Sequence, residues 1–578
     1  MNPGILLTDG VFIGLFCGGL RAPWLWSAAA ALSWLLIALL PPRTSAAPLL
    51  PWGAWLAWAA LSAGLSPEPL LSLAAFCKLA APFAVFLLAL GRADDSVSRA
   101  WLLRLALAAP ILSLSAAYAF RPGYPGTGLL PPYYNYTACV LACAYGATLS
   151  ASLQRELVRA ERLALAGSAM IALCSIAAVR SRGALFSCGL VTFILLWRRQ
   201  ECRKILLSAL AAAVIPAVFF LNSHFGAAFL KSDLPSASVR PKIWACALAV
   251  AKDHPIFGTG PGRFERGFLQ HRFPAPPAYA ERYGLSTAYA HSEPLQAAAE
   301  TGFLGAFLLA MAIGSALWRS LSTLPPPDFK ARSFREPALA ACAAMLVQSF
   351  FDNVFALPGI AFLFALTLAA ALPSEAEGPA ARPAASRFWR PAAVFLAAAS
   401  ALAWWPSWAL SAHSERTALP GARGVEAALS ALELAPKNDY LWGLLSRTLL
   451  RDAPRTNALA LRAAREAGRL SPTDATHALL EADILRMQED WKGSLAAASR
   501  AAALEPGCVQ AHLLRAQALL RGASPAQARE ALSQARRAAA LSGPIRGNSP
   551  VGYAGRILEF DAALLEELSR ATMVPGVN

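Results

Sequence analysis

The sequence predicts an all-α membrane protein: a polytopic bundle of transmembrane helices followed by a helical domain outside the membrane. Of its 578 residues, 56% are hydrophobic and only 15% are charged, a balance too apolar for a soluble globular protein. The apolar residues gather in blocks of roughly 17–22, the length that a helix needs to cross a bilayer core. Helices are expected because backbone groups in lipid must find hydrogen-bond partners within their own segment.

The expected spans number about 12–13 and end at residue 411. They lie near residues 4–20, 24–40, 49–64, 70–90, 101–120, 134–152, 162–179, 183–197, 204–222, 295–318, 336–352, 358–373 and 391–411. We therefore expect a membrane domain at 1–411 with a long loop at 223–294, a helical domain at 412–572 and a tail at 573–578.

Basic residues indicate the orientation of the chain. The formal net charge is +16, and Arg and Lys cluster at 198–204, 319–335 and 382–390. Short loops rich in Arg and Lys stay in the cytoplasm, so with a cytoplasmic N-terminus these clusters face inward. The long loop and the C-terminal domain then lie on the outer side. Nucleic-acid binding is not expected, because much of the charge lies in short loops between spans.

Cysteine, histidine and glycine spacing indicates no metal or nucleotide site. None of the ten cysteines forms a C-x-x-C pair, and His224, His254 and His271 show no ligand spacing with His291. GTGPGRF at 258–264 is glycine-rich, but it lacks the G-x-G-x-x-G pattern and predicts a tight turn instead. No cofactor is therefore expected.

The region after residue 411 repeats. Pro436, Pro472 and Pro506 recur at intervals of 36 and 34 residues, each between two Ala- and Leu-rich helical stretches. This period resembles that of tetratricopeptide repeats, which present a concave surface to a protein partner. An unrelated helical bundle is the alternative.

Arginines on the outer side form a candidate anion site. Arg180 and Arg182 stand in the short connection AAVRSRGALF, on the side where basic residues are rare. Arg240 and Trp244 form an R-x-x-x-W pattern at the start of an amphipathic helix. The alternatives are that the paired arginines only snorkel to lipid headgroups and that Arg240 is a solvated charge at a helix start.

An isolated histidine precedes the next span, in AYAHSEPLQAAAETG. Ser292 is a suitable N-cap, so His291 lies at the positive end of a helix dipole, which favours the neutral imidazole. A neutral imidazole accepts a proton near neutral pH. Glu300, on the same helix, is an acid within a span and hence a candidate functional residue. An interfacial histidine without a chemical role is the alternative.

Six stretches together resemble one family, the O-antigen ligase and polymerase superfamily of membrane glycan transferases. They occur in the order of the family across roughly residues 120–370, and Ser292 stands where the family usually has Asn. The stretches are NYTACVLACAYG at 135–146, SRGA at 181–184, Arg240 with Trp244, HPIFGTGPGRF at 254–264, AHSEPLQAAAETGFLG at 290–305 and FFDNVFALPG at 350–359.

The resemblance implies a metal-independent glycosyltransferase of polysaccharide or lipopolysaccharide biosynthesis in a bacterial inner membrane. It implies catalytic roles for Arg182, Arg240 and His291, and we expect Arg180, Trp244 and Glu300 to bind substrate. The implied donor is a glycan on undecaprenyl pyrophosphate. The acceptor is a lipid, glycan or protein hydroxyl at the periplasmic face. O-antigen ligation, polymerisation and protein O-glycosylation all stay open, and a secondary transporter is the alternative outside this class.

Overall fold

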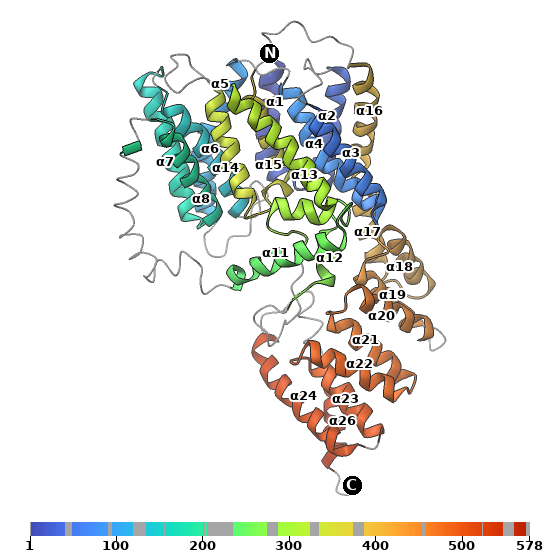
Figure 1. Ribbon diagram of the computed structural model, residues 1–578. Coiled ribbons are helices and arrows are strands. Elements are labelled where there is room, and N and C mark those ends of the chain that lie inside the picture. Colours follow the sequence, from blue (N-terminus) through green and yellow to red (C-terminus); the bar gives the residue numbers. More distant parts are fainter. Residues whose placement is uncertain are drawn as a thin grey trace.

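The structure is a computed structural model, and every regular element that it describes is a helix, which confirms the all-α prediction. It describes the whole chain except residues 1, 41–48, 91–94, 120–133, 155, 200–202, 205–234, 274–286, 324–333, 374–385, 453–456, 523, 547–559 and 574–578. Figure 1 shows a helical bundle and, below it, a tapering array of shorter helices that ends at the C-terminus.

The bundle contains the N-terminal and central helices. They are α1 (Pro3–Phe16), α2 (Pro23–Leu39), α3 (Leu50–Leu65), α4 (Pro69–Leu90), α5 (Asp95–Ala119), α6 (Tyr134–Ser152), α7 (Arg159–Ala178), α8 (Arg182–Trp197), α11 (Pro235–Asp253), α12 (Phe264–Gln270), α13 (Glu293–Ser322), α14 (Arg335–Ser349), α15 (Pro358–Ala371), α16 (Ser386–Leu402) and α17 (Trp405–Arg416). The expected span at 204–222 falls almost entirely outside the described residues.

Long apolar helices support a multi-pass membrane protein. Four stretches in the described part of the chain are long and apolar enough to cross a membrane: Pro69–Leu90, Arg159–Ala178, Glu293–Ser322 and Arg390–Arg416. Shorter apolar helices add to them: Pro3–Phe16, Pro23–Leu39, Arg182–Trp197 and Pro358–Ala371. The total of about 12–13 spans remains a prediction.

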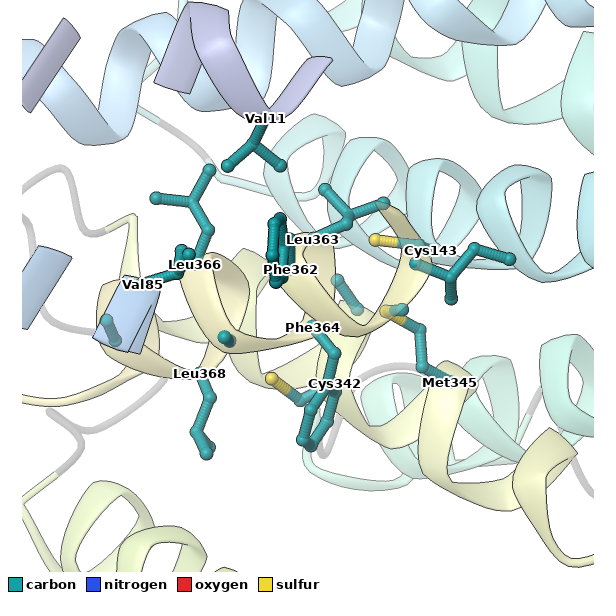
Figure 2. Packing of buried hydrophobic residues seen from close by; sticks show 14 of the residues in the cluster. Val11, Val85, Cys143, Cys342, Met345, Phe362, Leu363, Phe364, Leu366 and Leu368 are labelled. Atoms are coloured by element: carbon teal, nitrogen blue, oxygen red, sulfur yellow. The ribbon is translucent and has the colours of Figure 1, made fainter. Parts of the chain in front are cut away.

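Helix α15 lies at the centre of the bundle because it is apolar on every side. Nearly all of its residues are buried, including Phe362, Leu363 and Leu366. Figure 2 shows these side chains among Val11 of α1 and Met345 of α14. The core of the bundle therefore consists of closely packed apolar side chains, which fix the positions of its helices.

Helix α13 is broken at Gly302, and the glycine-rich loop that follows α11 fills the break. Gly302 has φ +75° and ψ 173°, so the helical hydrogen bonds are interrupted there. The freed carbonyl groups need other donors. Thr259 N donates to the Ala299 carbonyl at 3.0 Å, and Gly260 N donates to the Glu300 carbonyl at 2.9 Å. The loop therefore completes the helix.

Two glycines make this close contact possible. Gly258 has φ +67°, and a Cβ atom on it would lie 2.2 Å from the carbonyl carbon of Glu300. A Cβ atom on Gly302 would lie 2.1 Å from the carbonyl oxygen of Ile256. Any other residue would collide with backbone at either position, so the expected tight turn is present and has a structural purpose.

The C-terminal region is an array of helices in which each packs against the next along the chain. Buried alanines such as Ala428, Ala431, Ala460 and Ala498 let neighbouring helices approach closely. Helix α17 continues past residue 411, and the domain limits remain a prediction. The helices of the array are α18 (Ala422–Leu434), α19 (Asp439–Asp452), α20 (Asn457–Leu470), α21 (Ala475–Met487), α22 (Trp491–Leu504), α23 (Val509–Arg521), α24 (Pro525–Arg546) and α26 (Ala562–Met573).

Candidate active site

Arg240 reaches from α11 to the turn after α14. Its Nη1 donates to the carbonyl oxygen of Phe351 at 2.8 Å, and its Nη2 donates to Oδ2 of Asp352 at 3.2 Å. A guanidinium has five N–H donors. These two contacts therefore fix the side chain and still leave donors for an anionic ligand.

His291 meets the same carboxylate from the start of α13. Its Nδ1 lies 3.1 Å from Oδ1 of Asp352. Because an ionised carboxylate only accepts hydrogen bonds, Nδ1 carries a proton, and Nε2 is the nitrogen that can act as a base when the ring is neutral. Trp244 donates from Nε1 to the carbonyl oxygen of His291 at 3.2 Å. Arg240, Trp244 and His291, which the sequence analysis singled out separately, therefore lie together.

Asp352 is the residue that joins them, and it is only 6% exposed. The hydrogen bond from His291 and the charge of Arg240 both favour the ionised form of this carboxyl group. The backbone N–H of Asn353 adds a further bond to Oδ1 at 2.9 Å. Asp352 therefore stays ionised and can orient the imidazole.

The N-terminus of α8 is tied to this carboxylate through Asn135. Ser181 donates from Oγ to Oδ1 of Asn135 at 3.0 Å, and the side-chain amide of Asn135 donates to Asp352. Arg182 follows Ser181 directly as the first residue of α8, and its side chain is half-buried. Arg180 is exposed. The structure thus brings the backbone of the predicted arginine pair to the edge of the site.

Backbone strain also coincides with the site. Arg180 has φ +54° and His291 has φ +52°, and only two other non-glycine residues in the described ranges have positive φ. Such conformations cost on the order of 1–3 kcal/mol each and persist where the surrounding contacts impose them. For His291, the hydrogen bond to Asp352 and the bond from Trp244 are such contacts.

Glu300 lies deeper along α13 and has internal partners. Its Oε1 accepts from Gln296 Nε2 at 2.7 Å and from Phe264 N at 3.3 Å. Gln296 in turn accepts from Ala290 N at 2.6 Å. This chain of bonds orders the residue before His291 and the start of α12. Substrate binding by Glu300 remains a prediction.

Ser292 occupies the N-cap position of α13, as expected, but its side chain forms no capping hydrogen bond. Glu293, the first residue of the helix, accepts from Phe355 N at 2.7 Å and so links α13 to the turn that carries Asp352. The entry to α13 is therefore held by Glu293 and Gln296 together.

Asp352 and Asn135 are functional candidates that emerge only from the structure. Both lie in stretches that carry the family resemblance, FFDNVFALPG and NYTACVLACAYG. The available signal was an acid at the end of the apolar span expected at 336–352, since acids within spans are usually functional. Sequence alone could not show that this acid meets His291.

One group of side chains in the described part of the chain has a spacing suited to a metal ion: Asp439, Asp474 and His477. It lies in the C-terminal helical array and is paired with Arg266 and Arg272. The candidate active site does not include it.

Comparison with known proteins gives a family match that covers part of the chain. Residues 167–310 match the family model described as O-antigen ligase, and no curated protein matches the chain. The matched region holds all six residues that the sequence analysis selected, from Arg180 to Glu300, and it ends before Asp352. The protein therefore carries an O-antigen ligase family domain within a helical membrane protein, which implies activity on lipid-linked glycans.

Proposed function

We propose that the protein transfers a glycan from undecaprenyl pyrophosphate to an acceptor hydroxyl at the periplasmic face of a bacterial inner membrane. The observation that carries this proposal is the convergence of Arg240 and His291 on buried Asp352, in a chain whose residues 167–310 match the O-antigen ligase family. The cluster pairs a fixed cation with an oriented base, which are the two groups that such a transfer requires.

In this proposal the arginines bind the pyrophosphate. Arg240 is held by Phe351 and Asp352 but keeps free N–H donors, and Arg182 begins the helix next to it. Guanidinium groups bind phosphate oxygens in pairs and offset the charge that grows as the pyrophosphate leaves. Arg180 adds a further positive charge at the outer edge.

His291 acts as the general base. Asp352 fixes the tautomer that presents Nε2, and this nitrogen takes the proton of the acceptor hydroxyl. The acceptor oxygen then bonds to the anomeric carbon as the bond from that carbon to the pyrophosphate oxygen breaks. Undecaprenyl pyrophosphate leaves with the electron pair. Attack opposite the leaving group inverts the configuration of the anomeric carbon.

The C-terminal helices would serve a different purpose. We assign them as tetratricopeptide-like repeats on the outer side of the membrane, where they offer a surface to a protein partner. Their recurring prolines and their serial packing support this assignment. The chemistry proposed for His291 is the same for a lipid, glycan or protein acceptor.

The test is donor consumption by the purified protein with its acceptor. His291→Ala should abolish transfer and leave donor binding intact, because general-base catalysis contributes about 10²–10⁴-fold. Arg240→Ala should weaken both, and Arg240→Lys should restore them only in part, because an ammonium lacks the planar fork. His254→Ala, an exposed histidine nearby, serves as the control. Full activity in His291→Ala would refute the assignment.

A further inference from the structure

The outer segment around α12 inserts a buried arginine into the C-terminal helical array. Arg272 is only 6% exposed. Its Nη2 donates to Ser471 Oγ at 2.8 Å, and its Nε donates to Thr473 Oγ1 at 3.2 Å. Asp474 supplies a negative charge, with Oδ2 3.9 Å from Nη2 of Arg272. A guanidinium buried in this way is tolerated because its donors and its charge both have partners.

A second set of charges surrounds the same contact. Arg266 of α12 lies 3.4 Å from Asp439 of α19 and 3.7 Å from Glu68, which directly precedes α4. Arg263 donates to Glu68 at 2.7 Å. The side-chain amide of Gln270 donates to the Leu470 carbonyl. Three parts of the chain therefore meet here: the bundle, the outer segment and the array.

The charge balance identifies this cluster as an interface and not as a metal site. Asp439, Asp474 and His477 offer ligand atoms within 4.8 Å of one another. However, Arg266 and Arg272 already offset the two carboxylates, and a divalent cation there would face both guanidinium groups. His477 bonds to Asp439 at 3.0 Å, so it is engaged as well.

The opposite side of α12 packs against the segments that carry the candidate active site. Phe264 and Phe268 are fully buried against Ile243 and Val250 of α11, and against Ala290. Ile243 lies three residues after Arg240, and Ala290 precedes His291. Figure 1 shows α11 and α12 between the bundle and the array. Helix α12 is therefore packed against the two segments that carry Arg240 and His291.

We infer that the C-terminal array is a structural part of the active site, and that Arg272 is a positioning residue. By docking α12 to the array, Arg272 holds α11, and with it Arg240, in place. The docking itself rests on the contacts above, and its effect on catalysis rests on the proposed function.

The experiment separates the two parts of this inference. A protease recognition sequence is placed at 418–420, an exposed segment between α17 and α18. The purified protein is cleaved in detergent and analysed by size-exclusion chromatography. The unmodified interface should keep the two fragments together, and transfer should stay within about twofold of that of the intact chain.

Arg272→Ala should increase the share of fragments that separate after cleavage, although Leu71 of α4 also packs against the array. In the intact chain it should raise the KM for donor and lower kcat/KM about 10- to 100-fold, because small displacements of catalytic groups reduce rates by such factors. The KM for acceptor should not change. Arg272→Lys should restore both properties in part. Arg465→Ala removes an exposed ion pair to Glu481 in the same array and is the control. Gln270→Ala replaces Arg272→Ala if that variant does not fold.

Separation of the unmodified fragments on cleavage would refute the docking. Release of the fragments in Arg272→Ala without a change in the KM for donor would refute the positioning role. If no variant transfers glycan, fragment association still tests the docking, and the proposed function fails by itself.

Discussion

Asp352→Asn tests the candidate active site most directly, because the substitution keeps the shape of the side chain and changes its hydrogen bonding. In the protein, Oδ1 accepts from His291 Nδ1 and Asn353 N, and Oδ2 accepts from Arg240 and Asn135. Four donors thus meet one carboxylate. A carboxamide offers one acceptor and one donor group, so it cannot satisfy all four.

Both orientations of the new amide are unfavourable. If its oxygen faces His291, its NH₂ group faces the donors of Arg240 and Asn135. If it is reversed, Nδ1 of His291 loses its acceptor and the proton moves to Nε2, where the base is needed. Hydrogen bonds to charged groups contribute about 1.5–3 kcal/mol each. Loss of one or two costs about 2–5 kcal/mol, which is roughly 30- to 5,000-fold in rate.

The assay is the single-turnover rate of transfer with lipid-linked donor, with donor binding measured in parallel. Asp253→Asn is a matched control, because Asp253 also pairs with a histidine, His271 at 2.5 Å, but its side chain is 54% exposed. We expect the control to stay within about twofold, because exposed ion pairs contribute little. A wild-type rate in Asp352→Asn would show that His291 is not a base oriented by this carboxylate.

Three further predictions follow from the fold. Gly302→Ala should prevent stable folding, whereas Gly314→Ala in the same helix, with no atom within 4 Å, should keep or raise the melting temperature. The fragments cleaved at 418–420 should separate on chromatography as the pH falls below 3.8. The ordinary pKa of an aspartate is 3.8; burial would raise the pKa of Asp439, but the bond from His477 and the charge of Arg266 lower it. The stabilisation of the interface by ionised Asp439 is therefore complete above pH 3.8 and is lost as the pH falls through the lowered pKa. Tyr440→Cys in a cysteine-free chain should react with an impermeant maleimide in intact spheroplasts, and labelling only after lysis would reverse the orientation.

Sequence periodicity was enough to predict the helical class and the helices that bear the site. The break in α13 was harder to predict, because Gly302 stands in an apolar helical pattern and only its contact with Ile256 and Pro255 shows why the helix is interrupted. Local propensity is a property of neighbouring residues, whereas this break is imposed by a loop more than forty residues earlier in the chain.

The same limit explains why Asp352 and Arg272 were not selected. Asp352 is 61 residues from His291 and 112 from Arg240, so their meeting depends on how α11, α13 and α14 pack. In the sequence, Arg272 looks like a solvated arginine of a polar loop. Only its contacts with the array show that it is buried. Charged residues at tertiary contacts have no sequence period, so only the three-dimensional structure reveals them.

The arrangement of helix ends favours a charged donor over the transport of a neutral solute. Arg182 is the first residue of α8, and His291 lies just before the start of α13, so two positive dipole ends face the site. Two acids lie there as well: Asp352, which pairs with Arg240, and Glu293, the first residue of α13. The arginines offset these acids, and the two dipole ends are left to attract an anion. A pyrophosphate would be stabilised by this field, and a neutral solute would gain little from it.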